Sequence, residues 1–173
     1  HADAGRLPAT AGRLAFITTL RGGRHRPETS RGIATDRDAM GHAASLIVAE
    51  AVSSGYSGIV LDFAGMTARD LDALIAVAST ISDSAHAHNV RPVVISVPAA
   101  DTAGYPGQLL ASISDLLLVL SYDQHAQGTG PGSPASPECV IQQLRARAAA
   151  TGANQHIAAR PVGWSRWVRS GQA

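Results

Sequence analysis

The chain has 173 residues, of which 45% are hydrophobic and 16% charged, and its formal net charge is +1. This composition is typical of one globular domain, residues 1–173, that is large enough to bury a core. The near-neutral charge gives no electrostatic reason to expect a nucleic-acid partner. Cys139 is the only cysteine, so an intrachain disulfide is excluded and we expect a buried, unreactive thiol. No apolar run approaches the roughly 18 residues of a membrane span.

Strand and helix patterns alternate from the first apolar run onward. Residues 13–20 are expected to form a strand, and a polar loop rich in Arg and Gly follows over 21–34. The next pattern, 35–55, predicts a helix that starts at Thr35 or Asp36 and ends at Gly55. Its buried face should consist of Met40, Ala44, Ile47, Val48 and Ala51.

The second half of the chain continues the alternation. Residues 58–63 predict a strand, and Thr67 with Asp70 has the spacing of a helix-capping pair. Apolar residues then recur at helical spacing: Leu71, Leu74, Ile75, Ala78 and Ile81. The remaining expected elements are a strand at 91–99, a short helix at 105–114, a strand at 115–123, a loop at 125–136, a helix at 136–152 and a strand at 156–164.

The strands are nearly continuous apolar runs, which indicates that both of their faces are covered, as in a parallel sheet wrapped by helices. The fold class is therefore α/β, and an open doubly wound sheet and a (β/α)8 barrel both fit this pattern. No glycine-rich phosphate-binding fingerprint opens a helix, so we expect no nucleotide and no other cofactor.

Functional groups in either architecture gather where the strands end. The candidates at the five strand ends are Thr18, Thr19 and Arg21; Asp62 and Ala64; Ser96 and Pro98; Ser121, Tyr122, Asp123 and His125; and Arg160, Trp164 and Trp167. A carboxylate at the end of a buried strand needs a partner or a raised pKa. Asp62 could cap a loop or pair with an arginine instead of acting on a ligand, and Asp123 could bind the backbone of the loop behind it.

The chain resembles family 18 glycoside hydrolases of the bacterial spore-germination and cortex-lytic type in four segments: "GYSGIVLDFAGM", "RPVVISVPA", "DLLLVLSYDQHAQGTGPGSPAS" and "HIAARPVGWSRW". The resemblance covers roughly residues 13–167, and "YDQHAQGTGPGSPAS" is its most specific part. It implies a TIM-type barrel and a retaining mechanism in which the acetamido group of the substrate is the nucleophile.

The same resemblance assigns roles to single positions. Asp62 matches the aspartate that orients the acetamide, and Tyr122 with Asp123 matches the pair after the sixth barrel strand. The catalytic acid position holds Ala64, and Val60 replaces a further aspartate. A methyl group cannot donate a proton, and general acid catalysis is typically worth about 10²–10⁴-fold. Glu28 is the one plausible substitute acid.

Three other features have a plain structural interpretation that we favour. Trp164 and Trp167 could stack on a sugar together with Tyr122, but packing at a strand end accounts for them as well. The two histidines of "HAH" at 86–88 face different ways on a helix and predict a solvated helix end rather than a metal site. The arginine-rich stretch 21–31 could hold an anionic partner, although an exposed loop is the simpler interpretation.

A complete (β/α)8 barrel needs about 200–250 residues, whereas five strands are expected here, matching strands three to seven of the family. Five strands would leave two unpaired edges, which natural sheets avoid. We therefore expect a partial barrel that is completed by a longer polypeptide or by another chain.

The leading hypothesis is a non-catalytic glycosidase-like domain that serves as a structural or accessory subunit of a larger envelope or membrane-associated assembly, with other protein subunits as partners. By resemblance alone, its location would be extracytoplasmic, in the periplasm or cell envelope. The alternatives are a lectin-like module that holds an N-acetylated glycan through Asp62, Tyr122, Asp123 and Trp164, and an active hydrolase that uses another acid.

Overall fold

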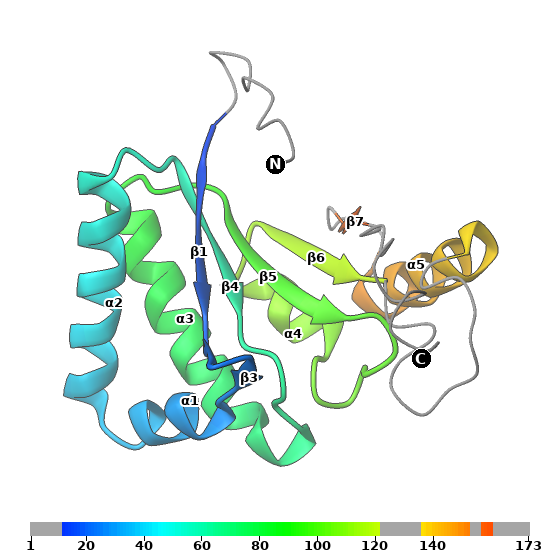
Figure 1. Cartoon of the computed structure of the whole chain (residues 1–173), viewed down its shortest axis with the longest axis horizontal. Helices are drawn as coiled ribbons and strands as arrows, with labels where there is room; N and C mark the ends of the chain where they lie inside the picture. Colours follow the sequence, from blue (N-terminus) through cyan, green and yellow to red (C-terminus); the bar gives the residue numbers. More distant parts are fainter. Residues whose placement is uncertain (1–11, 122–135, 153–156, 161–173) are drawn as a thin grey trace, which may run out of the picture.

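A parallel sheet of five strands runs through the centre of the structure (Figure 1). The computed structural model describes residues 12–121 and 136–152, and the backbone of 157–160. The strands stand in the order β1 (Leu14–Thr18), β4 (Gly58–Asp62), β5 (Val93–Pro98), β6 (Leu116–Leu120) and β7 (Ile157–Arg160). The α/β class and the five expected strands are confirmed. Where both can be compared within the described residues, the sequence placed most strand boundaries one or two residues too far out.

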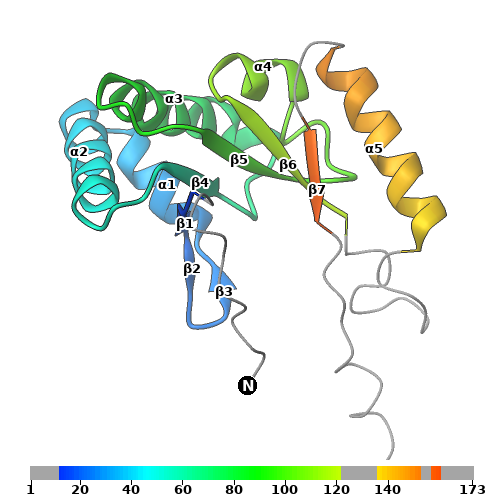
Figure 2. The ribbon, with the colours of Figure 1, turned by 90° about the horizontal axis from the view of Figure 1, so that it is seen from above.

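The helices lie on one side of this sheet, as Figure 2 shows for α2 to α5. Their bounds are α1 (Pro27–Ala34), α2 (Arg37–Ser53), η1 (Ala68–Asp70), α3 (Leu71–Ala87), α4 (Gly107–Ser112) and α5 (Pro137–Thr151). The core lies between sheet and helices, because alternate strand residues face the helices and are almost fully buried: Ile59, Leu61, Val93, Ile95, Val97, Leu117 and Val119. The opposite face of the sheet carries the strand-end residues discussed below.

Helix α2 starts and packs as predicted. The Asp36 carboxylate accepts hydrogen bonds from the amides of Asp38 (2.9 Å) and Ala39 (3.2 Å), which satisfies two of the unpaired N–H groups at the helix start. Ala44, Val48 and Ala51 are buried. The other two predicted core residues of the helix, Met40 and Ile47, pack against the core from half-buried positions.

Helix α3 likewise follows the predicted pattern. The Asp70 carboxylate accepts hydrogen bonds from the Thr67 amide and hydroxyl, both at 2.8 Å. Leu74, Ala78 and Ile81 are buried in the core. A capping pair followed by apolar residues at helical spacing was therefore sufficient to place this helix.

The expected loop over 21–34 is wrong. Strands β2 (Leu20–Arg21) and β3 (Arg24–His25) form an antiparallel hairpin, and α1 follows directly. Gly22 and Gly23 make the hairpin turn with φ angles of 59° and 76°, a conformation that glycine adopts without steric cost. Pro27 begins α1, where its missing N–H costs no hydrogen bond.

Two smaller expectations also change. His86 is not part of a solvated helix end, because its Nε2 lies 2.9 Å from Asp115 Oδ2 and both side chains are half-buried. Asp115 further accepts hydrogen bonds from Arg91 (3.0 Å) and from the Val93 amide (2.8 Å). Burial opposes ionisation of Asp115, but these donors outweigh it and lower its pKa. Cys139 is half-buried rather than buried.

Candidate functional site

Three polar side chains meet where β1, β4 and β5 end. Thr18 is paired with Asp62 in the register of β1 and β4, and Ser96 follows the residue paired with Leu61 on β5. Thr18 Oγ1 donates to Asp62 Oδ2 at 3.2 Å, and Ser96 Oγ donates to Asp62 Oδ1 at 2.6 Å. The predicted gathering of strand-end residues at one edge is confirmed for these three positions.

Asp62 is therefore a satisfied buried carboxylate. Its relative exposure is 8%, and each of its oxygens accepts a hydroxyl hydrogen bond. These donors compensate for the loss of water around the charge. In the described part of the chain, no loop amide and no arginine bonds to Asp62, as the structural alternatives drawn from the sequence would require. Hydroxyls on the neighbouring strands do so instead.

The segment after β4 carries Ala64 on a loop that is held from two sides. The Tyr105 hydroxyl donates to the Phe63 carbonyl at 2.7 Å and accepts from the Met66 amide at 3.1 Å. Burial raises the pKa of Tyr105, so its phenol stays protonated and can serve as this donor. The sequence placed Tyr105 only at the start of a short helix, and no local signal linked it to residues 63–66.

Arg147 holds the segment between β5 and α4 through its backbone carbonyls. It lies in α5 with 0% relative exposure and donates to the Tyr105 carbonyl at 2.7 Å, as well as to the carbonyls of Pro98 and Asp101. Burial lowers the pKa of the guanidinium, and the charge of Asp101 opposes this effect. The sequence analysis missed Arg147. It is one of two arginines in an alanine-rich helix, and no local pattern distinguishes it from Arg145.

Val60 occupies the position two residues before Asp62 and is 8% exposed. Alternate residues of a strand face the same side, so Val60 and Asp62 share the face of the sheet that is turned away from the helices. An apolar side chain therefore stands where the resemblance implies a second aspartate.

Glu28 lies in the first turn of α1 rather than in a loop. Its side chain is 58% exposed, and its Oε1 forms an ion pair with Arg26 Nη1 at 3.5 Å. No hydrogen bond in the part of the chain that the structure describes connects Glu28 with Asp62 or its neighbours.

The other predicted site residues fall outside the described residues: Tyr122, Asp123, His125, Trp164 and Trp167. Arg160 belongs to β7, of which only the backbone is described. Ser121 follows β6 and is buried, and its hydroxyl has no hydrogen-bond partner among the described residues.

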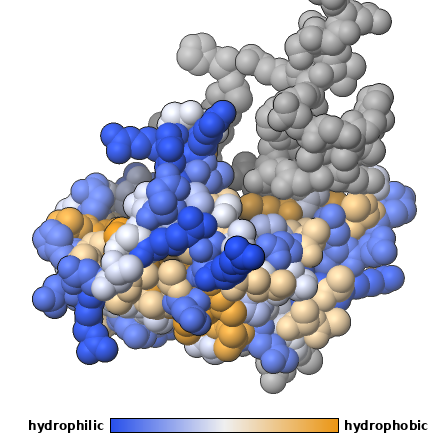
Figure 3. Space-filling view, turned by 90° about the horizontal axis from the view of Figure 1, so that it is seen from below, coloured by the Kyte–Doolittle hydropathy of each residue, from blue (hydrophilic) through white to orange (hydrophobic). Residues whose placement is uncertain are grey.

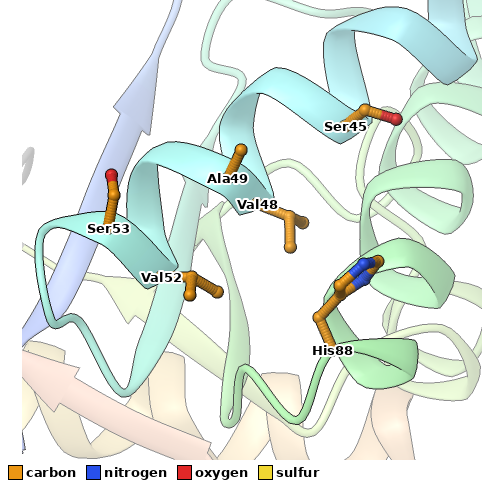
Figure 4. A pocket seen from close by; sticks show the side chains of 6 residues that line it. All are labelled: Ser45, Val48, Ala49, Val52, Ser53 and His88. Atoms are coloured by element: carbon orange, nitrogen blue, oxygen red, sulfur yellow. The ribbon is translucent and has the colours of Figure 1, made fainter.

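A groove of 340 Å³ lies elsewhere on the molecule, between α2 and the end of α3 (Figure 4). It is lined by Ser45, Val48, Ala49, Val52, Ser53 and His88. Since these residues precede β4 and β5, the groove is at the opposite end of the sheet from Asp62.

Across the described ranges, no three His, Cys, Asp or Glu side chains are grouped as a metal site would require. Nor does any described helix have the length and hydropathy of a bilayer span.

The fold is similar to those of several solved structures. A class V chitinase from Pseudomonas fluorescens Pf-5 superposes with a TM-score of 0.74 and 24% identity over 84% of this chain and 48% of its own. A chitinase from Chromobacterium violaceum superposes with a TM-score of 0.74 and 21% sequence identity, over 86% of this chain and 48% of its own. The spore cortex-lytic enzyme SleL from Bacillus megaterium superposes with a TM-score of 0.73 and 15% sequence identity, over 84% of this chain and 34% of its own. No protein-family model and no curated protein sequence matches the chain.

These similarities define the class of fold. The chain has the α/β architecture of chitinase-type and cortex-lytic glycosidase barrels, as the resemblance predicted. It spans about half the length of the two chitinases, so the structure is that of a partial barrel. At these identities the likeness establishes the fold and leaves the chemistry to the residues themselves.

Proposed function

We propose that this chain is a non-catalytic glycosidase-like domain that serves as a structural subunit of a larger extracytoplasmic assembly. The observation that carries the non-catalytic part is the methyl group of Ala64 at the position where the resemblance requires an acid. Val60 and the hydroxyl-bonded Asp62 support it, because the described groups that bind Asp62 are the hydroxyls of Thr18 and Ser96, and neither is an acid able to protonate a glycosidic oxygen.

Hydrolysis of a fluorogenic chitobioside tests the non-catalytic part. The chain should release no fluorophore above the buffer rate. Ala64→Glu asks whether the rest of the site is functional, since it restores the missing proton donor while Val60 stays in place of the second aspartate. Hydrolysis by the unaltered chain that disappears in Glu28→Gln would contradict the proposal and support an active enzyme with a substitute acid.

The edge of the sheet supports the structural part. Leu14 and Phe16 on β1 are 37% and 60% exposed, and by register they share the sheet face of Val60 and Asp62. Among the described strands, β1 pairs only with β4. An apolar, unpaired edge strand is a template for association with another strand.

The number of strands indicates what covers this edge. A (β/α)8 barrel has eight strands, and the described part of this chain supplies five of them. Three further β/α units would close the barrel, whereas a second copy of this chain would bring five. We therefore expect the cover to be a complementary β/α segment of the assembly and not a second copy.

Self-association of the isolated chain tests the exposed edge. Without its cover, the chain should associate in a concentration-dependent way and bind the dye ANS. Phe16→Asp should reduce both effects. The matched control is Leu46→Asp, on the helix layer with 58% exposure, which should leave both unchanged. Equal effects of the two variants would count against a docking role for β1.

A second candidate function is binding of an N-acetylated glycan, and the polar cluster at Asp62 favours it because that cluster lies where the neighbouring strands end. Tyr122, Asp123 and Trp164 would complete such a site. Titration calorimetry with N-acetylglucosamine oligomers tests it, and the absence of heat at millimolar ligand would remove it.

A further inference from the structure

The β2–β3 hairpin places two arginines directly opposite each other. Arg21 and Arg24 are a register pair on either side of the Gly22–Gly23 turn, and both are exposed. Like charges at opposed positions of a two-stranded ribbon destabilise it. The hairpin therefore carries a local repulsion that an anion between the two guanidinium groups would relieve.

Within the described ranges, Arg21 and Arg24 also lack acidic partners. Arg26 pairs with Glu28, Arg31 with Asp70 and Arg91 with Asp115, but no ion pair among the described residues involves Arg21 or Arg24. Figure 2 shows the hairpin projecting from the sheet on the side away from the helices. In Figure 3 the corresponding projection is strongly hydrophilic.

The hairpin is attached directly to the Asp62 cluster. The Leu20 amide donates to Thr18 Oγ1 at 3.0 Å, the same oxygen that donates to Asp62. At its other strand, the Arg26 amide donates to the Thr19 carbonyl at 3.1 Å. The hairpin strands thus begin and end beside the candidate site.

The hairpin also packs beside the loop that carries Ala64. A Cβ built on Gly65 would lie 3.7 Å from His25 Cβ. The base of the hairpin therefore borders the segment that follows Asp62, and a glycan that lies over the Asp62 cluster and extends along the hairpin would reach Arg21 and Arg24.

We infer that this hairpin binds the carboxylate of an acidic N-acylated glycan. The inference rests on glycan binding, the second candidate function. The fork of a guanidinium matches a carboxylate in a bidentate manner, whereas a neutral chitin chain offers it no charge to pair with. The lactyl carboxylate of a muramic acid residue in peptide-free peptidoglycan strands has the required chemistry.

A comparison of two tetrasaccharides tests the inference. One is the peptide-free (GlcNAc–MurNAc)2 unit, and the other is neutral (GlcNAc)4. Binding is measured by calorimetry on the whole chain at about 10 °C, near the usual temperature of maximal stability. The chain should prefer the acidic tetrasaccharide by roughly fivefold, in keeping with exposed ion pairs. Added salt should narrow this preference.

The double variant Arg21→Gln/Arg24→Gln should lose the preference and keep its affinity for the neutral sugar. The matched control is Arg37→Gln/Arg145→Gln, which removes the same charge from exposed positions on α2 and α5. The control should retain the preference. Arg21→Lys/Arg24→Lys, which keeps the charge but loses the fork, should show an intermediate preference, and far-UV circular dichroism verifies that each variant is folded.

The outcomes separate the inference from the function on which it rests. Equal affinity of the unaltered chain for both tetrasaccharides overturns the inference and leaves glycan binding in place. Binding of neither sugar overturns glycan binding itself, and the inference with it. Binding of an acidic peptide, lost in the glutamine double variant, without binding of the acidic sugar would assign the hairpin to a protein partner and overturn the inference.

Discussion

At the residue scale, the stability of the Asp62 cluster, which Thr18, Asp62 and Ser96 form, depends on how Asp62 is bonded. The carboxylate is buried, and among the described residues its hydrogen-bond donors are two hydroxyls from neighbouring strands. Hydrogen bonds to ionised groups are stronger than neutral ones. The shorter bond, from Ser96, should therefore contribute more than the bond from Thr18.

Replacing Ser96 by Ala should lower the free energy of unfolding by about 1–3 kcal/mol, because Asp62 Oδ1 would be left buried without a donor. Urea unfolding measures the change. Ser45→Ala is the control: the Ser45 hydroxyl is exposed and donates to the Gly41 carbonyl one turn earlier in its own helix, so its loss should be nearly neutral. A similar small effect at both positions would contradict the assigned role of Ser96.

Asp70 should make the stability of the chain depend on pH. The Arg31 guanidinium, with N–O distances of 2.5 and 3.0 Å, and the Thr67 amide hold the pKa of Asp70 well below its usual range. The unfolded chain takes up a proton there near pH 4, whereas the folded chain does not. The ion pair therefore stabilises the fold above about pH 4, and this contribution is lost as the pH falls further.

The measurement is the free energy of unfolding in urea between neutral and acidic pH. Asp70→Asn should flatten the acidic limb of that curve, and Arg31→Ala should flatten the same limb because it breaks the same pair. An acidic limb that keeps its slope in both variants would show that other groups control it.

At the scale of secondary-structure elements, some features could be read from the sequence and some could not. Helices α2 and α3 were predictable because their caps and apolar spacing are local signals. The hairpin and α1 were missed because arginines and glycines hide a turn and a helix start that resemble a polar loop. The Gly-Gly pair and Pro27 were the available signals. Tyr105 and Arg147 act over more than 40 residues of sequence, so no local pattern contains them.

Gly58 shows how closely two neighbouring segments approach. A Cβ at this position would clash with the backbone around Pro92, which cannot turn aside as a side chain could. Gly58→Ala should therefore destabilise the chain by at least the roughly 1–3 kcal/mol typical of overpacking. Gly41→Ala in α2 is the matched control, since nothing lies within 4 Å of the added atom. It should stabilise the helix by about 0.5–1 kcal/mol.

Urea unfolding of the two variants provides the comparison, with opposite signs expected. Tolerance of alanine at position 58 would mean that β4 and the segment before β5 can separate without cost. The close approach seen in the structure would then contribute little to the alignment of the strands.

At the scale of the whole molecule, the half-open sheet was foreseen from the count of strands. Five apolar runs indicated a partial barrel, and the structure shows five parallel strands with a partly exposed first strand. The Asp62 cluster was predicted in part, because the register of the parallel strands brings Thr18, Asp62 and Ser96 together. The sequence alone could not show that the neighbouring hydroxyls satisfy Asp62, because that depends on side-chain orientation across three strands.

We expect the isolated 173-residue chain to unfold in a broad transition at low temperature, because its exposed strand edge loses the burial that further β/α units would supply. Differential scanning calorimetry at several protein concentrations measures the transition. A soluble monomer with a sharp two-state transition at high temperature would contradict the proposed structural role.

The Tyr105 hydroxyl bridges the Phe63 carbonyl and the Met66 amide, and this bridge gives the chain an intrinsic optical reporter. A phenol absorbs differently once it is ionised, and burial delays that ionisation. Alkaline difference spectra of the unaltered chain, minus those of Tyr105→Phe, therefore follow the closure of the segment bearing Ala64 without any attached label.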